Sequence, residues 1–123
     1  MTLDKWVWPI LFVPIVLLIV FVLLSHRRVN RIALTQTRLA SIEQRIREYD
    51  RTHQRLPDRL SALPGVGGQD NSIEDAWGSD IIYTLGPSRT VTLSSLGKDG
   101  KPGGTGDDAD IRKIFRISGP TTE

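Results

Sequence analysis

The chain has 123 residues, no cysteine, and 16 Lys and Arg side chains against 14 Asp and Glu side chains, which gives a net charge of +2. A chain of this length has room for one small domain. Its composition excludes a disulfide-stapled secreted domain and a collagen-like fibre, and its long apolar run excludes a fully soluble globular protein. The basic excess lies beside that run and is not interleaved with aromatic side chains, which argues against a nucleic-acid-binding protein.

The charges are divided unevenly along the chain. The first 60 residues carry ten basic and five acidic side chains, a net charge of +5, whereas the last 63 carry six basic and nine acidic side chains, a net charge of −3. We therefore expect a basic part next to the apolar run and an acidic distal part.

The apolar run is the nineteen-residue segment from Trp6 to Leu24, which has no charged side chain. As a helix it would be about 28 Å long, close to the bilayer hydrocarbon thickness of about 30 Å. A cleaved signal peptide would have a shorter apolar core, a basic segment before it and a small-residue cleavage site after it. Here Lys5 is the only basic side chain in front, and Ser25, His26 and two arginines follow. The sequence predicts that residues 1–25 form a retained transmembrane anchor.

A long amphipathic helix is expected after the anchor, over residues 26–56. No Gly or Pro interrupts the chain from Arg27 to Leu56, so the helix could continue from the membrane to about His53. Its apolar residues recur at helical spacing close to a heptad repeat, with Gln36 at the skipped position. This stripe could pack against the rest of its own domain or against a second copy of the chain. The stripe consists of Val29, Ile32, Leu39, Ile42, Ile46 and Tyr49.

Residues 57–123 are expected to form a small head with an α+β fold. A second, short helix is predicted over 56–63, with Pro57 in its first turn and Leu60 and Leu63 on one apolar edge. Runs of β-branched and aromatic residues at 81–85 and 90–95 predict a hairpin, because a Gly-Pro-Ser-Arg turn separates them. A third strand is predicted over 113–117, with Ile114 on one face and its neighbours Phe115 and Ile117 on the other.

A glycine-rich acidic loop, residues 95–111, connects the second and third predicted strands. Five of the ten residues from 97 to 106 are glycine, and carboxylates at Asp99, Asp107, Asp108 and Asp110 flank them. Ca²⁺ takes six to eight oxygen ligands from carboxylates, carbonyls and water, and glycines let carbonyls turn inward. The spacing fits neither an EF-hand nor a phosphate-binding loop. The loop is therefore a candidate calcium site, and its alternative is an ordinary flexible acidic loop.

Several separate stretches of the chain together resemble the pseudopilins of type II secretion systems, most of all the major pseudopilin. Ser95-Leu96-Gly97-Lys98-Asp99-Gly100, followed by Gly103-Gly104 and Asp107-Asp108-Ala109-Asp110-Ile111, resembles the family's S-L-G-A-D-G…G-G…D-A-D-I loop. Asp75-Ala76-Trp77-Gly78 with Tyr83 resembles its D-P-W-G-x-x-Y-x-Y stretch. The segment 42–63 resembles the end of the family's long helix, and Met1-Thr2-Leu3 resembles the start of a processed subunit. The resemblance covers nearly all of residues 26–112.

This resemblance implies a pilin-like α+β fold, in which a long N-terminal helix spans the membrane with its first half and carries a small antiparallel sheet. It also implies that the loop binds one Ca²⁺ that fixes the C-terminal β region. By motif, Asp99 and either Asp107 or Asp108 would be side-chain ligands and Leu96 would contribute its carbonyl. Asp110 would be a ligand or a cap for the following turn. Trp77 would be a core anchor of the β region.

The implied function is that of a structural subunit, and not an enzyme, in a bacterial type II secretion or related pilus-like apparatus. The expected partners are membrane lipid, other pseudopilin-like subunits or secretion-apparatus proteins, and further copies of the chain. The resemblance implies a single pass through the inner membrane with a periplasmic head. Arg27, Arg28 and Arg31 conflict with that orientation, because the positive-inside rule places the side that follows the apolar run in the cytoplasm.

Two features depart from the family and support an alternative function. No basic prepilin leader precedes Met1, and Lys5 stands where the mature family has a Glu that pairs subunits. A chain with these features could be a non-polymerising, membrane-tethered binding or regulatory protein that reuses the pseudopilin head.

Overall fold

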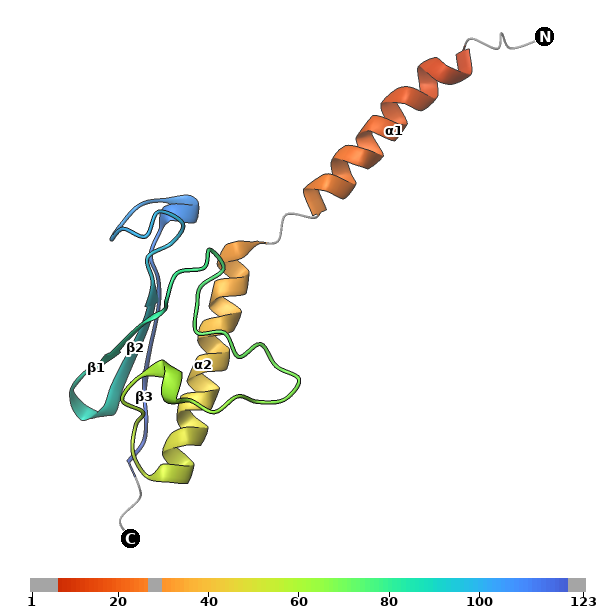
Figure 1. Ribbon diagram of the computed structural model, residues 1–123. Helices are drawn as coiled ribbons and strands as arrows, with labels where there is room; N and C mark the ends of the chain where they lie inside the picture. Colours follow the sequence, from red (N-terminus) through yellow and green to blue (C-terminus); the bar gives the residue numbers. More distant parts are fainter. Residues whose placement is uncertain (1–6, 27–29, 120–123) are drawn as a thin grey trace. The chain divides into compact units, whose positions relative to one another are not determined.

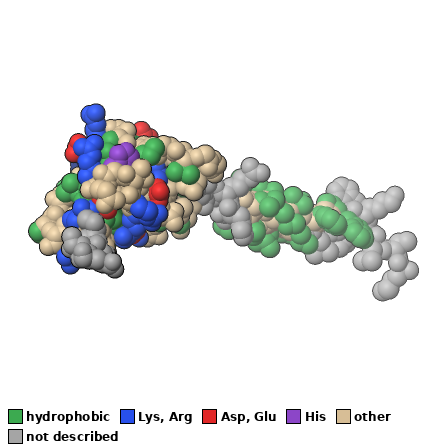
Figure 2. Space-filling model, turned by 90° about the horizontal axis from the view of Figure 1, so that it is seen from below, with side chains coloured by type: hydrophobic (Ala, Val, Ile, Leu, Met, Phe, Trp, Pro, Cys, Tyr) green, Lys and Arg blue, Asp and Glu red, His purple; other side chains and the backbone are tan. Residues whose placement is uncertain are grey.

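The computed structural model describes residues 7–26 and 30–119, which divide into two compact units at Asn30. The described part of the first unit is helix α1, Val7–His26 (Figure 1). Most of its apolar side chains are exposed, and hydrophobic atoms cover its surface in Figure 2. No helix within 7–26 or 30–119 combines the length and the apolar character needed to cross a membrane. The anchor predicted over residues 1–25 stays a prediction, and residues 1–6 lie outside the described part.

The second unit, here called the head, begins with helix α2, Arg31–His53. The helix ends where it was predicted to end, because Gln54 has a left-handed φ of 55° and its N–H bonds the Asp50 carbonyl at 2.7 Å. The predicted uninterrupted helix appears as two elements, α1 and α2. The junction at residues 27–29 lies outside the described residues.

The stripe of α2 packs against its own domain, as one of the two sequence interpretations predicted. Leu39, Ile42, Ile46 and Tyr49 are all buried, with Ile42 and Ile46 fully inaccessible. Thr35 occupies the next buried position toward the N-terminus, whereas Gln36 is exposed. Val29 lies outside the described residues. Association of the stripe with a second copy stays a prediction.

Three antiparallel strands lie along α2 in the order β1–β2–β3 (Figure 1). They are β1 Ile82–Leu85, β2 Thr90–Ser95 and β3 Ile111–Arg116, which confirms the predicted hairpin and extends the third strand toward its N-terminus. Val91 and Leu93 of β2 are fully buried in the core. Ile114 is 62% exposed on the opposite face, whereas Ile117 is buried, as the alternation predicted. The α+β fold class is confirmed.

The short helix predicted over 56–63 is wrong in extent. Only a single 3₁₀ turn, η1, forms at Leu60–Ala62, and Arg59 before it is extended. The predicted apolar edge is nevertheless confirmed, because Leu60 and Leu63 are 6% and 7% exposed and belong to the core. One turn is enough to bury both leucines, and nucleating a longer helix in so short a segment is unfavourable.

Candidate functional site

The acidic loop leaves the sheet after β2 and returns at β3, at the same end of the head as the N-terminus of α2 (Figure 1). Its one regular element is the 3₁₀ turn η3, Gly106–Asp108. Among the predicted ligands, Asp99 and Asp107 are exposed, whereas Leu96, Asp108 and Asp110 are partly buried. The carboxylates of the loop therefore differ in their exposure to solvent.

Hydrogen bonds within the loop tie its two limbs together. The Lys98 N–H donates to the Asp107 carbonyl at 2.8 Å. The Gly103 N–H donates to Asp110 Oδ1 at 3.1 Å. Asp110 thus holds the preceding part of the loop, and its role as a ligand or as a cap of the following turn stays a prediction. Asp99 closes its own turn, because its Oδ1 accepts the N–H of Lys101 at 3.0 Å.

Two glycines let the limbs approach each other closely. A Cβ atom on Gly97 would lie 2.8 Å from the carbonyl oxygens of Asp107 and Ala109. A Cβ atom on Gly104 would lie 2.6 Å from the Asp108 carbonyl oxygen. Both glycines also have positive φ angles, which side chains disfavour. Main-chain carbonyls of 107–109 are therefore packed against the start of the loop, where only glycine fits.

The donors of the loop fit a metal ion only in part. Within the described residues, no three His, Cys, Asp or Glu side chains gather closely enough to hold a metal. Ca²⁺ also accepts main-chain carbonyls and water, and two carboxylates with several such oxygens make an adequate set. Both kinds of oxygen donor, carboxylates and main-chain carbonyls, lie within this one short segment.

A buried carboxylate behind the loop was not predicted as a functional residue. Asp75 is only 1% exposed. Its Oδ1 accepts the N–H groups of Trp77 and Ser79 at 3.0 and 2.9 Å, and its Oδ2 accepts the hydroxyl of Ser95 at 2.7 Å. The sequence signal is an Asp two residues before a Trp-Gly turn, since Asp commonly accepts main-chain N–H groups just after itself. The signal identifies a turn but not the bond to Ser95.

Trp77 does not have the predicted role of a core anchor. Its side chain is only partly buried, and it lies outside the cluster of buried hydrophobic residues and their packed neighbours. The buried residue of this stretch is Asp75, which the predicted motif included without a role.

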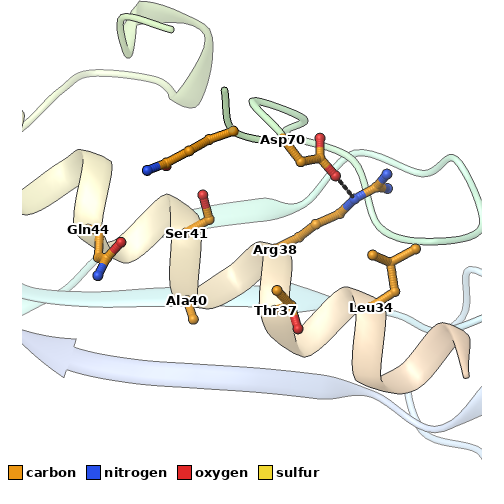
Figure 3. Close-up of a pocket in the computed structure, with 8 residues that line it drawn as sticks. Leu34, Thr37, Arg38, Ala40, Ser41, Gln44 and Asp70 are labelled. Carbon is orange, nitrogen blue, oxygen red and sulfur yellow. Dashed lines mark hydrogen bonds and ion pairs between the residues drawn. The ribbon is translucent and has the colours of Figure 1, made fainter. Parts of the chain in front are cut away.

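A shallow hollow of about 380 Å³ lies on the outer side of α2, beside the chain at 69–70 (Figure 3). Arg38 Nε pairs with Asp70 Oδ2 across it at 2.8 Å. Ser41 Oγ is buried here without a hydrogen-bond partner in the described part of the chain. The hollow is lined by Leu34, Thr37, Arg38, Ala40, Ser41, Gln44, Gln69 and Asp70. Hydroxyls, amides and one ion pair are thus the polar groups that it offers.

Comparison with known proteins connects this architecture to a secretion family. The family described as type II secretion system (T2SS), protein G, matches residues 23–114, which include α2, the sheet and the acidic loop. The type II secretion system core protein G of Xanthomonas campestris pv. campestris is 32% identical over 90 residues, which cover 64% of this chain and 63% of that protein. The chain thus spans less than two thirds of the length of this relative. Since the family match extends over most of the chain, the protein belongs to the type II secretion protein G family, a family of pseudopilins.

Proposed function

We propose that this protein is a structural subunit of a bacterial type II secretion or related pilus-like apparatus. The family match over residues 23–114 is the observation that carries this function. A long helix packed on a small sheet also suits a subunit that works by stacking, because its helix can contact neighbours along its length. Its contribution to secretion is assembly, and not catalysis.

We further propose that the apolar N-terminal segment anchors the subunit in the inner membrane, in contact with lipid, with the head in the periplasm. The nineteen uncharged residues from Trp6 to Leu24 support this placement. A reporter enzyme that is active only outside the cytoplasm, fused after Glu123, should be active in intact cells. An inactive reporter of equal abundance would contradict the periplasmic head and would agree with the arginines that follow the segment.

Assembly with further copies of the chain or with other pseudopilin-like subunits can be tested in membranes. Crosslinking of the full chain at its lysines should give a ladder of dimers, trimers and higher species. Lys98 and Lys101 are exposed in the acidic loop and can react. A monomer band alone, at an expression level that supports secretion, would contradict assembly. That result would favour the alternative of a non-polymerising, membrane-tethered binding protein.

The acidic loop is proposed to bind one Ca²⁺ that stabilises the head. Asp99 and Asp107 or Asp108 would supply carboxylate oxygens, and Leu96 its carbonyl. Asp110 would hold the loop through Gly103 and could add its second oxygen. The two tied limbs and the crowded carbonyls of 107–109 support this proposal, because they hold oxygen donors at a fixed spacing. Bound calcium would also offset the repulsion among four carboxylates.

Thermal unfolding of the full chain in detergent tests the calcium site. With a dissociation constant of about 10⁻⁴ M, 1 mM Ca²⁺ would stabilise the head by about 1.4 kcal/mol, or raise the thermal midpoint by about 5 to 10 °C, relative to chelator. Asp107→Asn combined with Asp108→Asn should abolish this rise. Asp80→Asn, at an exposed carboxylate outside the loop, should retain it. Equal midpoints of the unmodified chain in calcium and in chelator would refute the site.

A further inference from the structure

Asp75 lies between the acidic loop and helix α2. Its carboxylate is almost completely buried, and its three hydrogen bonds in the described part of the chain come from neutral groups. Two of these groups are the main-chain N–H groups of Trp77 and Ser79, and the third is the hydroxyl of Ser95. A buried carboxyl group that is held by so few donors depends on all of them, because the loss of one leaves a costly unsatisfied group.

On the loop side, Ser95 connects the Asp75 carboxylate to the start of the acidic loop. Ser95 is fully buried at the end of β2. Its hydroxyl donates to Asp75 Oδ2 at 2.7 Å and accepts the N–H of Gly97 at 3.2 Å. Gly97 is the residue against which the carbonyls of 107–109 pack. The position of Asp75 thus determines the position of Gly97, where the two limbs of the loop are in contact.

On the helix side, the segment that carries Asp75 is held by the first turns of α2. Thr35 is fully buried, and its Oγ1 accepts the N–H of Ala76 at 3.0 Å. Arg38 Nη1 donates to the carbonyls of Asp75 and Glu74 at 2.8 and 3.2 Å. Thr35 and Arg38 thus hold the main chain at 74–76, and the side chain of Asp75 is linked through Ser95 to Gly97.

We infer that Asp75 is a positioning residue that couples the acidic loop to the N-terminal half of α2. Order in the loop stabilises the packing of α2, and the packing of α2 favours the ordered loop. The role of calcium in this coupling rests on the proposed function. An ion bound in the loop stabilises the packing of α2, and by reciprocity the packed helix increases the affinity of the loop for calcium. The helix that stacks in an assembly would then respond to the ion.

Thr35 and Thr37 provide a matched pair of variants for the test. Thr35 supports the Asp75 segment, whereas the exposed Thr37 donates to the Ala33 carbonyl of its own helix, at 2.9 Å. The full chain in detergent with chelator is followed by amide hydrogen exchange in peptides that cover residues 96–110. Thr35→Ala should speed exchange in the loop by about threefold or more relative to Thr37→Ala. Thr35→Ser keeps the hydroxyl and should restore slow exchange.

General destabilisation is separated from coupling by a third variant. Tyr83→Phe removes a hydrogen bond to the Pro57 carbonyl, which involves neither the Asp75 segment nor the loop. It should leave exchange in the loop slow at a comparable loss of global stability. Equal loop exchange in Thr35→Ala and Thr37→Ala, or equal acceleration by Tyr83→Phe, would overturn the coupling.

The calcium part is measured separately by titration with Ca²⁺ alone. Thr35→Ala should raise the dissociation constant by about threefold or more, and Thr37→Ala should leave it unchanged. If the unmodified chain binds no calcium, the calcium site of the proposed function fails. The exchange comparison in chelator still decides whether Asp75 couples the loop to the helix.

Discussion

Arg45 is a charged residue in the core region of the head, with only 6% of its surface exposed. Its guanidinium donates to three main-chain carbonyls, those of Pro64, Asn71 and Leu63, at 3.3, 3.1 and 3.3 Å. Burial lowers the pKa of Arg45. Arg45 therefore connects α2 to the chain that follows η1, because its guanidinium provides hydrogen bonds to carbonyls that the fold removes from water.

We expect Arg45→Ala to lower the free energy of unfolding by about 2 to 4 kcal/mol, because it leaves three carbonyls without their donor. The neighbouring exposed variant Gln44→Ala should change it by less than about 0.5 kcal/mol. Chemical denaturation of both variants under the same conditions measures the difference. Equal losses would show that water replaces the guanidinium at no cost.

Glu43 connects α2 to β3 by charge. Its Oε1 accepts Arg47 Nη2 at 2.7 Å, and its Oε2 pairs with Lys113 Nζ at 3.0 Å. Burial acts to raise the pKa of Glu43, but hydrogen bonds and charge from Arg47 and Lys113 outweigh it, so the pKa lies below its ordinary value of 4.5. Arg47 lies one turn after Glu43 on the same helix, so this pair is local, whereas the pair with Lys113 links the helix to β3.

Because the pKa of Glu43 is lowered in the folded state, the free energy of unfolding depends on pH in the acidic range. The contribution of Glu43 is complete above its unfolded pKa of about 4.5 and is lost as the pH falls through the lower folded value. The unmodified chain should therefore lose more stability between about pH 5 and pH 3 than Glu43→Gln does. Denaturation at a series of pH values measures the two slopes, and Gln44→Ala should follow the unmodified chain. Parallel curves for all three would contradict the lowered pKa.

At the scale of single residues, periodicity predicts apolar positions well and buried polar positions poorly. Leu39, Ile42 and Ile46 follow from helical spacing alone. Arg45 looks like an ordinary surface residue in the sequence, because its carbonyl partners lie 18 or more residues away along the chain. Asp75 is recognisable as a turn residue, but its bond to Ser95, 20 residues away, is not. Spacing along one element carries no information about such partners.

Among the elements, the strands were predicted to within about one or two residues, because alternation, β-branching and a Gly-Pro turn agree. The short helix was overpredicted, because one turn already buries Leu60 and Leu63. For the acidic loop, the sequence predicted a glycine-rich connection between two strands with carboxylates around it. It could not predict which limb each carboxylate holds, since that depends on bonds such as Asp110 to Gly103.

Two glycine variants test the path of the folded acidic loop. Gly97 and Gly100 both have positive φ, at 73° and 65°, so alanine strains the backbone at either position. Only at Gly97 would the added Cβ atom collide with main-chain atoms, whereas Gly100 faces open space. Gly97→Ala should therefore destabilise the head by about 1 to 3 kcal/mol more than Gly100→Ala. Equal stabilities of the two variants would contradict the close approach of the two limbs.

At the scale of the whole molecule, the division at Asn30 separates two units with different surfaces. Every residue of the buried hydrophobic cluster lies between Leu39 and Ile117, inside the second unit. The second unit thus has a hydrophobic core of its own, as expected for a domain that folds by itself.

Residues 31–123, expressed alone, should therefore fold in aqueous buffer with a thermal midpoint close to that of the head in the full chain. A matched chain that starts at Glu43 lacks Thr35, Leu39 and Ile42, all of which are almost completely buried, and should not unfold cooperatively. Circular dichroism on heating distinguishes the two. If residues 31–123 stayed unfolded while the full chain unfolded cooperatively in detergent, the head would depend on α1, contrary to the contents of its core.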